Sequence, residues 1–148
     1  AMLATTMALN SLRDVEACAA AFPGGPGVSV LSDFHERGDH VSSRFAIGAS
    51  GGTPMAEAIL WASARLAERS PDRRKIILVA TDGEPDDPEA TRAVIASARR
   101  IGQEVYGLGI DCPDAKSLFP RFSRCSDVAH LCEALLTLFH GVLKRRSA

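Results

Sequence analysis

Side chains that could ligate a hard cation gather in two short segments of the chain. The first is residues 51–54 (GGTP) and the second is residues 81–87 (TDGEPDD). Hydroxyl and carboxylate oxygens are the ligands that Mg²⁺ takes in proteins, so Thr53 and the hydroxyl and acidic side chains of residues 81–87 are candidate metal ligands. Each segment also has a purely structural explanation, because Thr53 and the acids could simply cap the helices that follow them.

Enzymatic chemistry finds less support in the residue pattern. No nucleophile is paired with a base, and neither a G-x-x-x-x-G-K-[ST] phosphate loop nor a G-x-G-x-x-G sequence opening a helix is present. His35 and His40 are expected in a polar turn, and His130 and His140 on the surface of the last helix. The acids between residues 82 and 87 leave a metal-assisted hydrolase or phosphotransferase as the weaker alternative, so we expect a protein that is not an enzyme.

Composition narrows the classes of partner. The 148 residues predict a single domain, 1–148, and the net charge of −1 gives no reason to expect binding to nucleic acid or anionic lipid. No run of about 18 apolar residues is present, so no membrane span is expected, and the N-terminus does not resemble a signal peptide. The cysteines form no C-x-x-C pair, which predicts reduced thiols in a cytoplasmic protein and no zinc site. They are Cys18, Cys112, Cys125 and Cys132.

The elements that must position these residues alternate between helices and strands. Apolar periodicity predicts a helix over residues 2–22, a break at 23–27, a strand over 28–34 and a short return strand over 41–45 that completes a hairpin. The following helices are expected at residues 55–69, 88–101, 116–119 and 127–144. The following strands are expected at residues 75–81, 104–110 and 122–125. This alternation predicts an α/β fold with an open, mostly parallel sheet flanked by helices.

The expected sheet suggests where the chemistry lies. Ligands bind at the carboxyl ends of parallel strands, and these ends carry Asp33, residues 81–84 and Asp111. The buried stripes expected on the two central helices are Ile59, Leu60, Ala62 and Leu66, and Val94, Ile95, Ala98 and Ile101. Trp61 and Tyr106 are expected to pack in or near the core.

The two candidate segments together resemble the von Willebrand factor A family. The carrying sequences are GGTPMAEAILWASARL and RRKIILVATDGEPDD, at the separation typical of that family, with YGLGID and DVAHLCEALLTLFHGVL following. They look closest to the bacterial branch containing the cobaltochelatase accessory subunit and the nitric-oxide-reductase activation protein. The resemblance implies that Thr53 and Asp82 stand at two of the five ligand positions of a metal-ion-dependent adhesion site.

The sequence departs from that family at its front. The family's first central strand ends in Asp-x-Ser-x-Ser, and nothing here matches it, so the domain resembles a family member truncated at its N-terminus. Two oxygen ligands bind Mg²⁺ weakly, and a sheet without its middle strand has unpaired edges. We therefore expect dimerisation or strand exchange, or a longer natural product.

The resemblance implies a protein-binding module that works beside an AAA+ ATPase of the MoxR or chelatase type, with Mg²⁺ in a partial site. A second interpretation is a degenerate domain that binds no metal and serves oligomerisation. The two differ in metal affinity alone, so a metal titration separates them.

Overall fold

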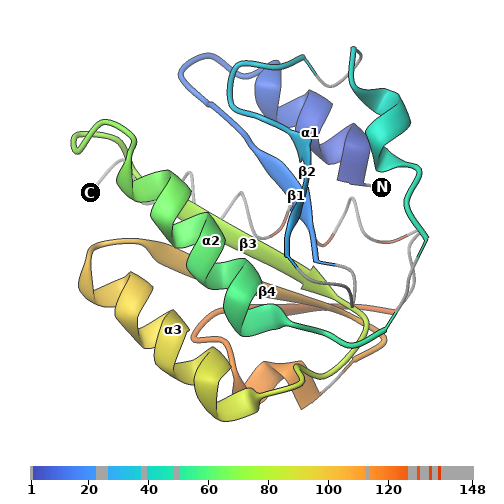
Figure 1. Ribbon diagram of the computed structural model, residues 1–148, viewed down its shortest axis with the longest axis vertical. Helices are drawn as coiled ribbons and strands as arrows, with labels where there is room; N and C mark the ends of the chain where they lie inside the picture. The colour runs from blue at the N-terminus through green and yellow to red at the C-terminus, as the bar shows by residue number, and fades with distance from the viewer. Residues whose placement is uncertain are drawn as a thin grey trace.

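The computed structural model shows an α/β protein with helices packed on a parallel sheet (Figure 1). The structure describes residues 2–22, 27–37, 40–48, 51–112 and 114–126, together with His130, Ala134 and Thr137. The open, mostly parallel sheet flanked by helices that the sequence predicts is confirmed. No helix among these residues is long and apolar enough to cross a membrane.

The main sheet contains three parallel strands in the order β3-β4-β5. They are β3 (Ile76–Thr81), β4 (Glu104–Ile110) and β5 (Phe122–Cys125), close to the predicted positions. In register, Ile76 lies opposite Glu104 and Gly107 lies opposite Phe122. The continuous apolar run of β3 is typical of a strand covered on both faces, and none of its residues is exposed.

Two helices cover one face of this sheet. They are α2 (Met55–Ala67) and α3 (Pro88–Arg100), both as predicted to within two residues at either end. Their buried side chains form one core with those of β3 and β4; the members include Met55, Ile59, Ile77, Val79, Ile95, Ala98 and Val105. Two residues of the predicted stripes do not join it, because Leu60 is 58% exposed and Ile101 is 61% exposed. Both lie at the margin of their stripe, where the helix surface turns toward solvent.

The opposite face of the sheet is also covered. Leu108 and Cys125 are buried there with Leu78, Ala80 and Ile110 packed around them, and Ala134 joins this cluster. Ala134 and Thr137 are helical and belong to the predicted helix 127–144, whose other residues, apart from His130, lie outside the described part of the chain.

Gly107 in β4 allows the ring of Phe119 to pack directly against the sheet. A Cβ at Gly107 would lie 2.3 Å from a ring carbon of Phe119, so only glycine lets this ring pack against the strand. Phe119 follows a short 3-10 helix, η2 (Asp114–Ser117), which stands where the sequence predicted a short helix at 116–119.

The N-terminal part of the chain differs from prediction. The helix α1 ends early (Met2–Asn10), and the segment expected to continue it forms β1 (Ala19–Ala21), which pairs antiparallel with β2 (Ser29–Ser32). The side chain of Ser11 donates to the carbonyl of Ala8 (2.7 Å), and Asp14 has a φ of 63°. Local side-chain hydrogen bonding and pairing with β2 therefore override the helical periodicity.

The predicted return strand at residues 41–45 is also wrong. Ser42–Phe45 forms a 3-10 helix, η1, and β2 takes its partner from the preceding segment instead. The carboxylate of Glu36 accepts from the amide of Asp33 (2.9 Å) and from Arg44 (2.8 Å), which turns the chain before a return strand can form.

Candidate functional site

The two candidate segments meet at the carboxyl end of β3. The amide of Thr53 donates to a carboxylate oxygen of Asp86 (2.8 Å), and the amide of Asp86 donates to the carbonyl of Thr53 (3.0 Å). This reciprocal pair closes the loop before α2 onto the loop after β3. A Cβ at Gly52 would lie 2.5 Å from the Asp86 carboxylate, so the absence of a side chain at Gly52 permits the contact.

The hydroxyl of Thr53 faces the turn that contains Asp82. A Cβ built on Gly83 would lie 3.4 Å from the Thr53 hydroxyl oxygen, which places this oxygen beside the residue after Asp82. The turn itself is held by Thr81, whose buried hydroxyl donates to the carbonyl of Gly83 (2.9 Å). Asp82 is exposed at the tip of the turn. The structure therefore brings the segments of both predicted ligands together.

The hydroxyl of Thr53 is not consumed by the helix that follows. Pro54 occupies the cap position of α2 with no side-chain hydrogen bond, and the carbonyl of Thr53 accepts from the amide of Met55 (2.7 Å). The structural explanation that Thr53 caps α2 is thus wrong. For Asp87 the structural explanation is correct, because its carboxylate accepts from the amide of Ala90 (2.9 Å) and caps α3.

The donors at this edge fit a weakly held, largely hydrated cation. Within the described residues, no group of three or more His, Cys, Asp or Glu side chains is placed to enclose a metal ion. Mg²⁺ keeps several waters and is commonly bound through one or two protein oxygens, so one carboxylate and one hydroxyl suit part of its shell. Asp86 is already bonded to the Thr53 amide and serves to position Thr53.

The other acids predicted at the carboxyl ends behave differently. Asp111 follows β4 and is exposed, with its carboxylate 3.6 Å from a guanidinium nitrogen of Arg124. Asp33 lies elsewhere, because its carboxylate binds Arg65 near the end of α2 at 2.5 and 2.7 Å. Ten residues of helical rise, about 15 Å, separate Arg65 from Met55 at the start of α2, and Thr53 lies two residues before Met55. Asp33 therefore lies at the amino end of the sheet, and its expected place at the carboxyl ends of the strands is wrong.

A charge cluster at the amino end of the sheet was not predicted. The carboxylate of Glu104 binds Arg74, accepts from Arg121 (2.7 Å) and accepts from the hydroxyl of Tyr106 (2.8 Å). The hydrogen bond from Arg74 is the main cause that lowers the pKa of Glu104 to about 2. These four residues are spread over residues 74–121, so sequence spacing gave no signal that they meet.

The histidines, the cysteines, Tyr106 and Trp61 occupy positions that fit surface or packing roles. His35, His40 and His130 are exposed, as expected for surface histidines. Tyr106 is buried and Trp61 is half-buried beneath the guanidinium of Arg65 (5.9 Å to the ring centroid), as expected for packing residues. Cys18 and Cys112 are free thiols, and burial raises the pKa of Cys18 to about 11, which keeps this thiol protonated near neutral pH.

Comparison with known proteins identifies the fold. The chain superimposes on the crystal structure of the manganese-loaded TRAP protein of Plasmodium vivax with a TM-score of 0.67 at 15% sequence identity. The fold is of the von Willebrand factor A type. The match covers 90% of this chain and 62% of the TRAP chain, so the protein spans less than two thirds of that structure. No protein-family model and no curated protein sequence matches the chain.

Proposed function

We propose that this von Willebrand factor A-type domain is a protein-binding module that holds Mg²⁺ or Mn²⁺ at a partial site formed by Thr53 and Asp82. The observation that carries the proposal is the closure of the Thr53 loop onto the Asp82–Gly83 turn through Asp86. The structural neighbour was crystallised loaded with manganese, which supports a divalent cation at this edge.

The roles of the residues follow from their positions. Asp82 supplies the negative charge, Thr53 supplies a neutral oxygen, and Asp86 fixes the loop that carries Thr53. A carboxylate of a partner protein would complete the shell that two protein oxygens leave open. A bound cation would then supply an electrostatic link between the module and its partner.

The sequence resemblance suggests the class of that partner. The bacterial branch that the chain resembles works beside AAA+ ATPases of the MoxR or chelatase type, and we propose such an ATPase as the partner. The free thiols Cys18 and Cys112 support a reducing, cytoplasmic setting. Among the described residues β3 is bonded to a strand on one side only, which supports dimerisation or strand exchange, or pairing with another polypeptide.

A calorimetric titration with Mg²⁺ and Mn²⁺ tests the metal site. We expect saturable binding by the wild-type protein that is lost in Asp82→Ala and weakened in Thr53→Val. Glu89→Gln is the matched control, because Glu89 is an exposed acid in the first turn of α3 and its substitution also removes one negative charge. If Glu89→Gln lost metal binding to the same extent, the titration would report the net negative charge of the surface, and the proposed ligands would be wrong.

The partner is tested with a purified MoxR-type ATPase in surface plasmon resonance. We expect binding that requires Mg²⁺ and is abolished by Asp82→Ala but not by Glu89→Gln. Binding that is unchanged in EDTA would support the second candidate, a metal-free interaction or oligomerisation domain. That alternative is favoured by the small number of protein ligands described at the edge.

The enzymatic alternative is tested on the same preparations. A phosphatase and nucleotidase screen with Mg²⁺ and Mn²⁺ is expected to show no turnover above background. Robust turnover that disappears in Asp82→Ala would overturn the proposal of a binding module.

A further inference from the structure

Arg124 lies at the same edge of the sheet as the turn that carries Asp82. In the strand register, Arg124 of β5 lies opposite Gly109 of β4, and Gly109 lies opposite Thr81 of β3, the residue before Asp82. Two strand spacings, about 10 Å, therefore separate the backbone at Arg124 from the backbone at Thr81. The long side chain of an arginine can cover much of that distance.

Arg124 also belongs to the face of the sheet on which the proposed ligands lie. Val79 packs in the core cluster with α2 and α3, and Thr81 follows it by two residues, so both side chains face these helices. On β5, Phe122 packs against the same cluster, and Arg124 follows it by two residues. Thr53 directly precedes the start of α2 on this face. The side chain of Arg124 therefore leaves the sheet on the side of Thr53.

Asp111 holds the guanidinium of Arg124 near the end of β4. Its carboxylate lies 3.6 Å from a guanidinium nitrogen of Arg124. Asp111 has a φ of 51°, in the left-handed region that Asp tolerates better than most residues, and its amide donates to the carbonyl of Cys125 (2.9 Å). The chain then bends back so closely that a Cβ at Gly109 would lie 2.6 Å from the carbonyl oxygen of Cys112. The backbone thus fixes Asp111 at the carboxyl edge.

The ion pair between Arg124 and Asp111 contributes little to the stability of the fold. The two side chains are 56% and 80% exposed, and their separation of 3.6 Å is longer than a hydrogen bond. Among the described residues, the Arg124 side chain has no other ion pair or hydrogen bond. Most of its N–H donors are therefore open to an acceptor that comes from another molecule.

A partner carboxylate that docks at this edge needs a donor as well as a cation. When one of its oxygens binds the cation, the other oxygen still needs hydrogen bonds to replace the water that it loses. The exposed acids Asp82, Glu84 and Asp111 would also repel the incoming charge. A guanidinium offsets both effects, because it is positively charged and presents its N–H groups in a planar fork that matches a carboxylate.

We propose that Arg124 determines the specificity of the partner site by donating to the carboxylate oxygen that the cation leaves unbound. This inference rests on the proposed function, since it takes the edge at Asp82 as the place where the partner's acid docks. A neutral amide or hydroxyl oxygen could also bind a cation, but it could not form the charge-assisted pair with Arg124. The site therefore selects an Asp or Glu side chain of the partner.

Two affinities of the variant Arg124→Gln test this role. The affinity for Mg²⁺ alone, measured by calorimetry, should not fall, since a positive charge near the cation is removed. The affinity of the Mg²⁺-loaded protein for an end-blocked Gly-Gly-Glu-Gly-Gly peptide, measured by nuclear magnetic resonance at low salt, should fall about fivefold or more. Arg124→Lys keeps the charge but not the planar fork, so its affinity for the peptide should lie between those of the other two proteins.

The matched control is Arg92→Gln. Arg92 is an exposed arginine in the first half of α3, and its substitution removes the same charge from another element at the same end of the sheet. The control ligand is the peptide Gly-Gly-Gln-Gly-Gly, whose weaker binding should not change in Arg124→Gln. Equal loss of the glutamate peptide in the two arginine variants, or equal loss of both peptides in Arg124→Gln, would overturn the proposal.

The remaining outcomes separate this inference from the function on which it rests. Normal Mg²⁺ binding together with unchanged peptide affinity in Arg124→Gln would overturn the role of Arg124 and leave the metal site intact. A lower Mg²⁺ affinity in Arg124→Gln would show that Arg124 supports the structure of the edge, which also overturns its proposed role. Absence of Mg²⁺ binding by the wild-type protein would overturn the metal site and this inference together.

Discussion

The sheet unit, residues 51–125, and the N-terminal unit, residues 2–48, use similar proportions of apolar residues in opposite ways. In the sheet unit, apolar side chains of two helices and three strands bury one another on both faces of the sheet. In the N-terminal unit, many large apolar side chains remain exposed: Met2, Met7, Leu12, Val30 and Ile47. The helix α1 is apolar around most of its circumference, yet Met2 and Met7 on it are exposed.

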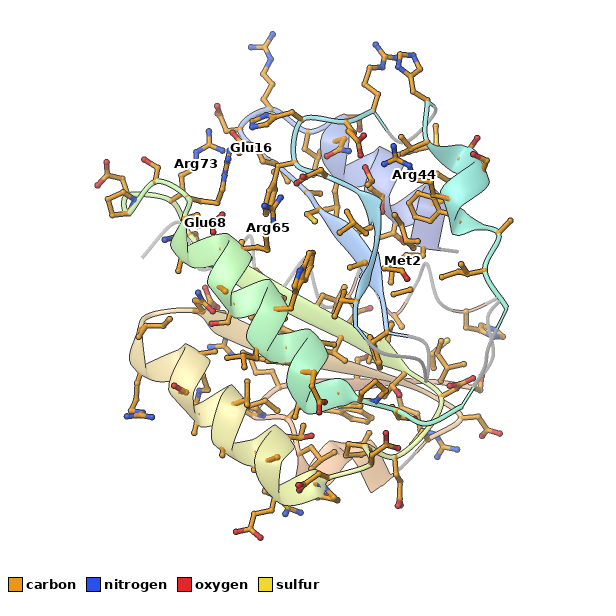
Figure 2. All side chains as sticks on the ribbon, viewed as in Figure 1. Met2, Glu16, Arg44, Arg65, Glu68 and Arg73 are labelled. Carbon is orange, nitrogen blue, oxygen red and sulfur yellow. The ribbon has the colours of Figure 1, made fainter. Side chains whose placement is uncertain are left out.

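The two units are joined mainly by charged and aromatic side chains. Arg65 of α2 binds Asp33, and Arg69 in the following turn binds Glu16 and lies 4.9 Å from the ring centroid of Phe34. Figure 2 shows Arg65 and Glu16 on the same side of the molecule. Exposed ion pairs contribute little to stability. The sheet unit therefore contributes more buried apolar contact to the stability of the fold than the N-terminal unit does.

The largest effect is expected from Ile59→Ala in the core of the sheet unit. Ile59 is 1% exposed, and removing its buried atoms should lower the free energy of unfolding by about 2–5 kcal/mol. Leu60→Ala is the control at the neighbouring, exposed position and should change it by less than about 0.5 kcal/mol. Urea denaturation measures both, and similar losses would contradict the assignment of the core.

The second effect is a dependence of stability on pH through Glu104. Its pKa is about 2 in the folded protein against 4.5 as the ordinary value, so its ion pairs stabilise the fold fully above pH 4.5. This stabilisation should be lost progressively as the pH falls from about 4.5 toward 2, where the folded carboxylate takes up a proton.

The same pH series in Glu104→Gln provides the check. The variant should be less stable at pH 7 and should lose less stability than the wild type between pH 4.5 and 2. Parallel curves for the two proteins, measured by thermal unfolding, would show that other groups cause the acid sensitivity.

A smaller effect is expected from Gly52→Ala at the carboxyl edge. The new Cβ would clash with the Asp86 carboxylate and break the hydrogen bond between Asp86 and the Thr53 amide. We expect the free energy of unfolding to fall by about 1–2 kcal/mol and Mg²⁺ binding, measured by calorimetry, to weaken. Gly48→Ala is the control, because a Cβ there meets no atom within 4 Å. Unchanged metal affinity in Gly52→Ala would separate the clamp from the proposed metal site.

The smallest effect is expected from Glu16→Gln in the junction between the units. The ion pairs with Arg69 and Arg73 are exposed and screened by salt, so the melting temperature should hardly change. Amide exchange in β1 should nevertheless become faster at low salt. A large fall in melting temperature would show that the junction contributes as much to stability as the core does.

The sheet unit could be predicted from sequence because its signals are local. The run IILVAT, the start of α3 at Asp87-Pro88 and the turn at Gly102 each fix an element within a few residues. The N-terminal unit could not, since the segment around β1 has helical periodicity and becomes a strand only through pairing with β2. The pairing of β1 with β2 is a contact between separate segments, and the periodicity of one segment carries no information about it.

The candidate site was predicted in part. Thr53 and Asp82 were chosen through the resemblance of their segments to a known family, and the structure brings their two loops together. The clamp by Asp86 was missed, because a carboxylate that binds a backbone amide looks like any other acid in the sequence. Asp33 was misplaced because β2 runs antiparallel to β1, which reverses the end of the sheet at which its last residue lies.

The Glu104 cluster has a consequence for alignment along the sheet. Arg74 precedes β3, Glu104 begins β4 and Arg121 precedes β5. The Glu104 carboxylate therefore links the amino ends of all three strands through ion pairs. A slip of one residue in β3 would turn Ile77 and Val79 out of the core, and this anchor opposes such a slip. The Glu104 cluster lies about 20 Å from Asp82, at the other end of β3. By fixing the register of β3, it also fixes the position of Asp82 relative to Thr53.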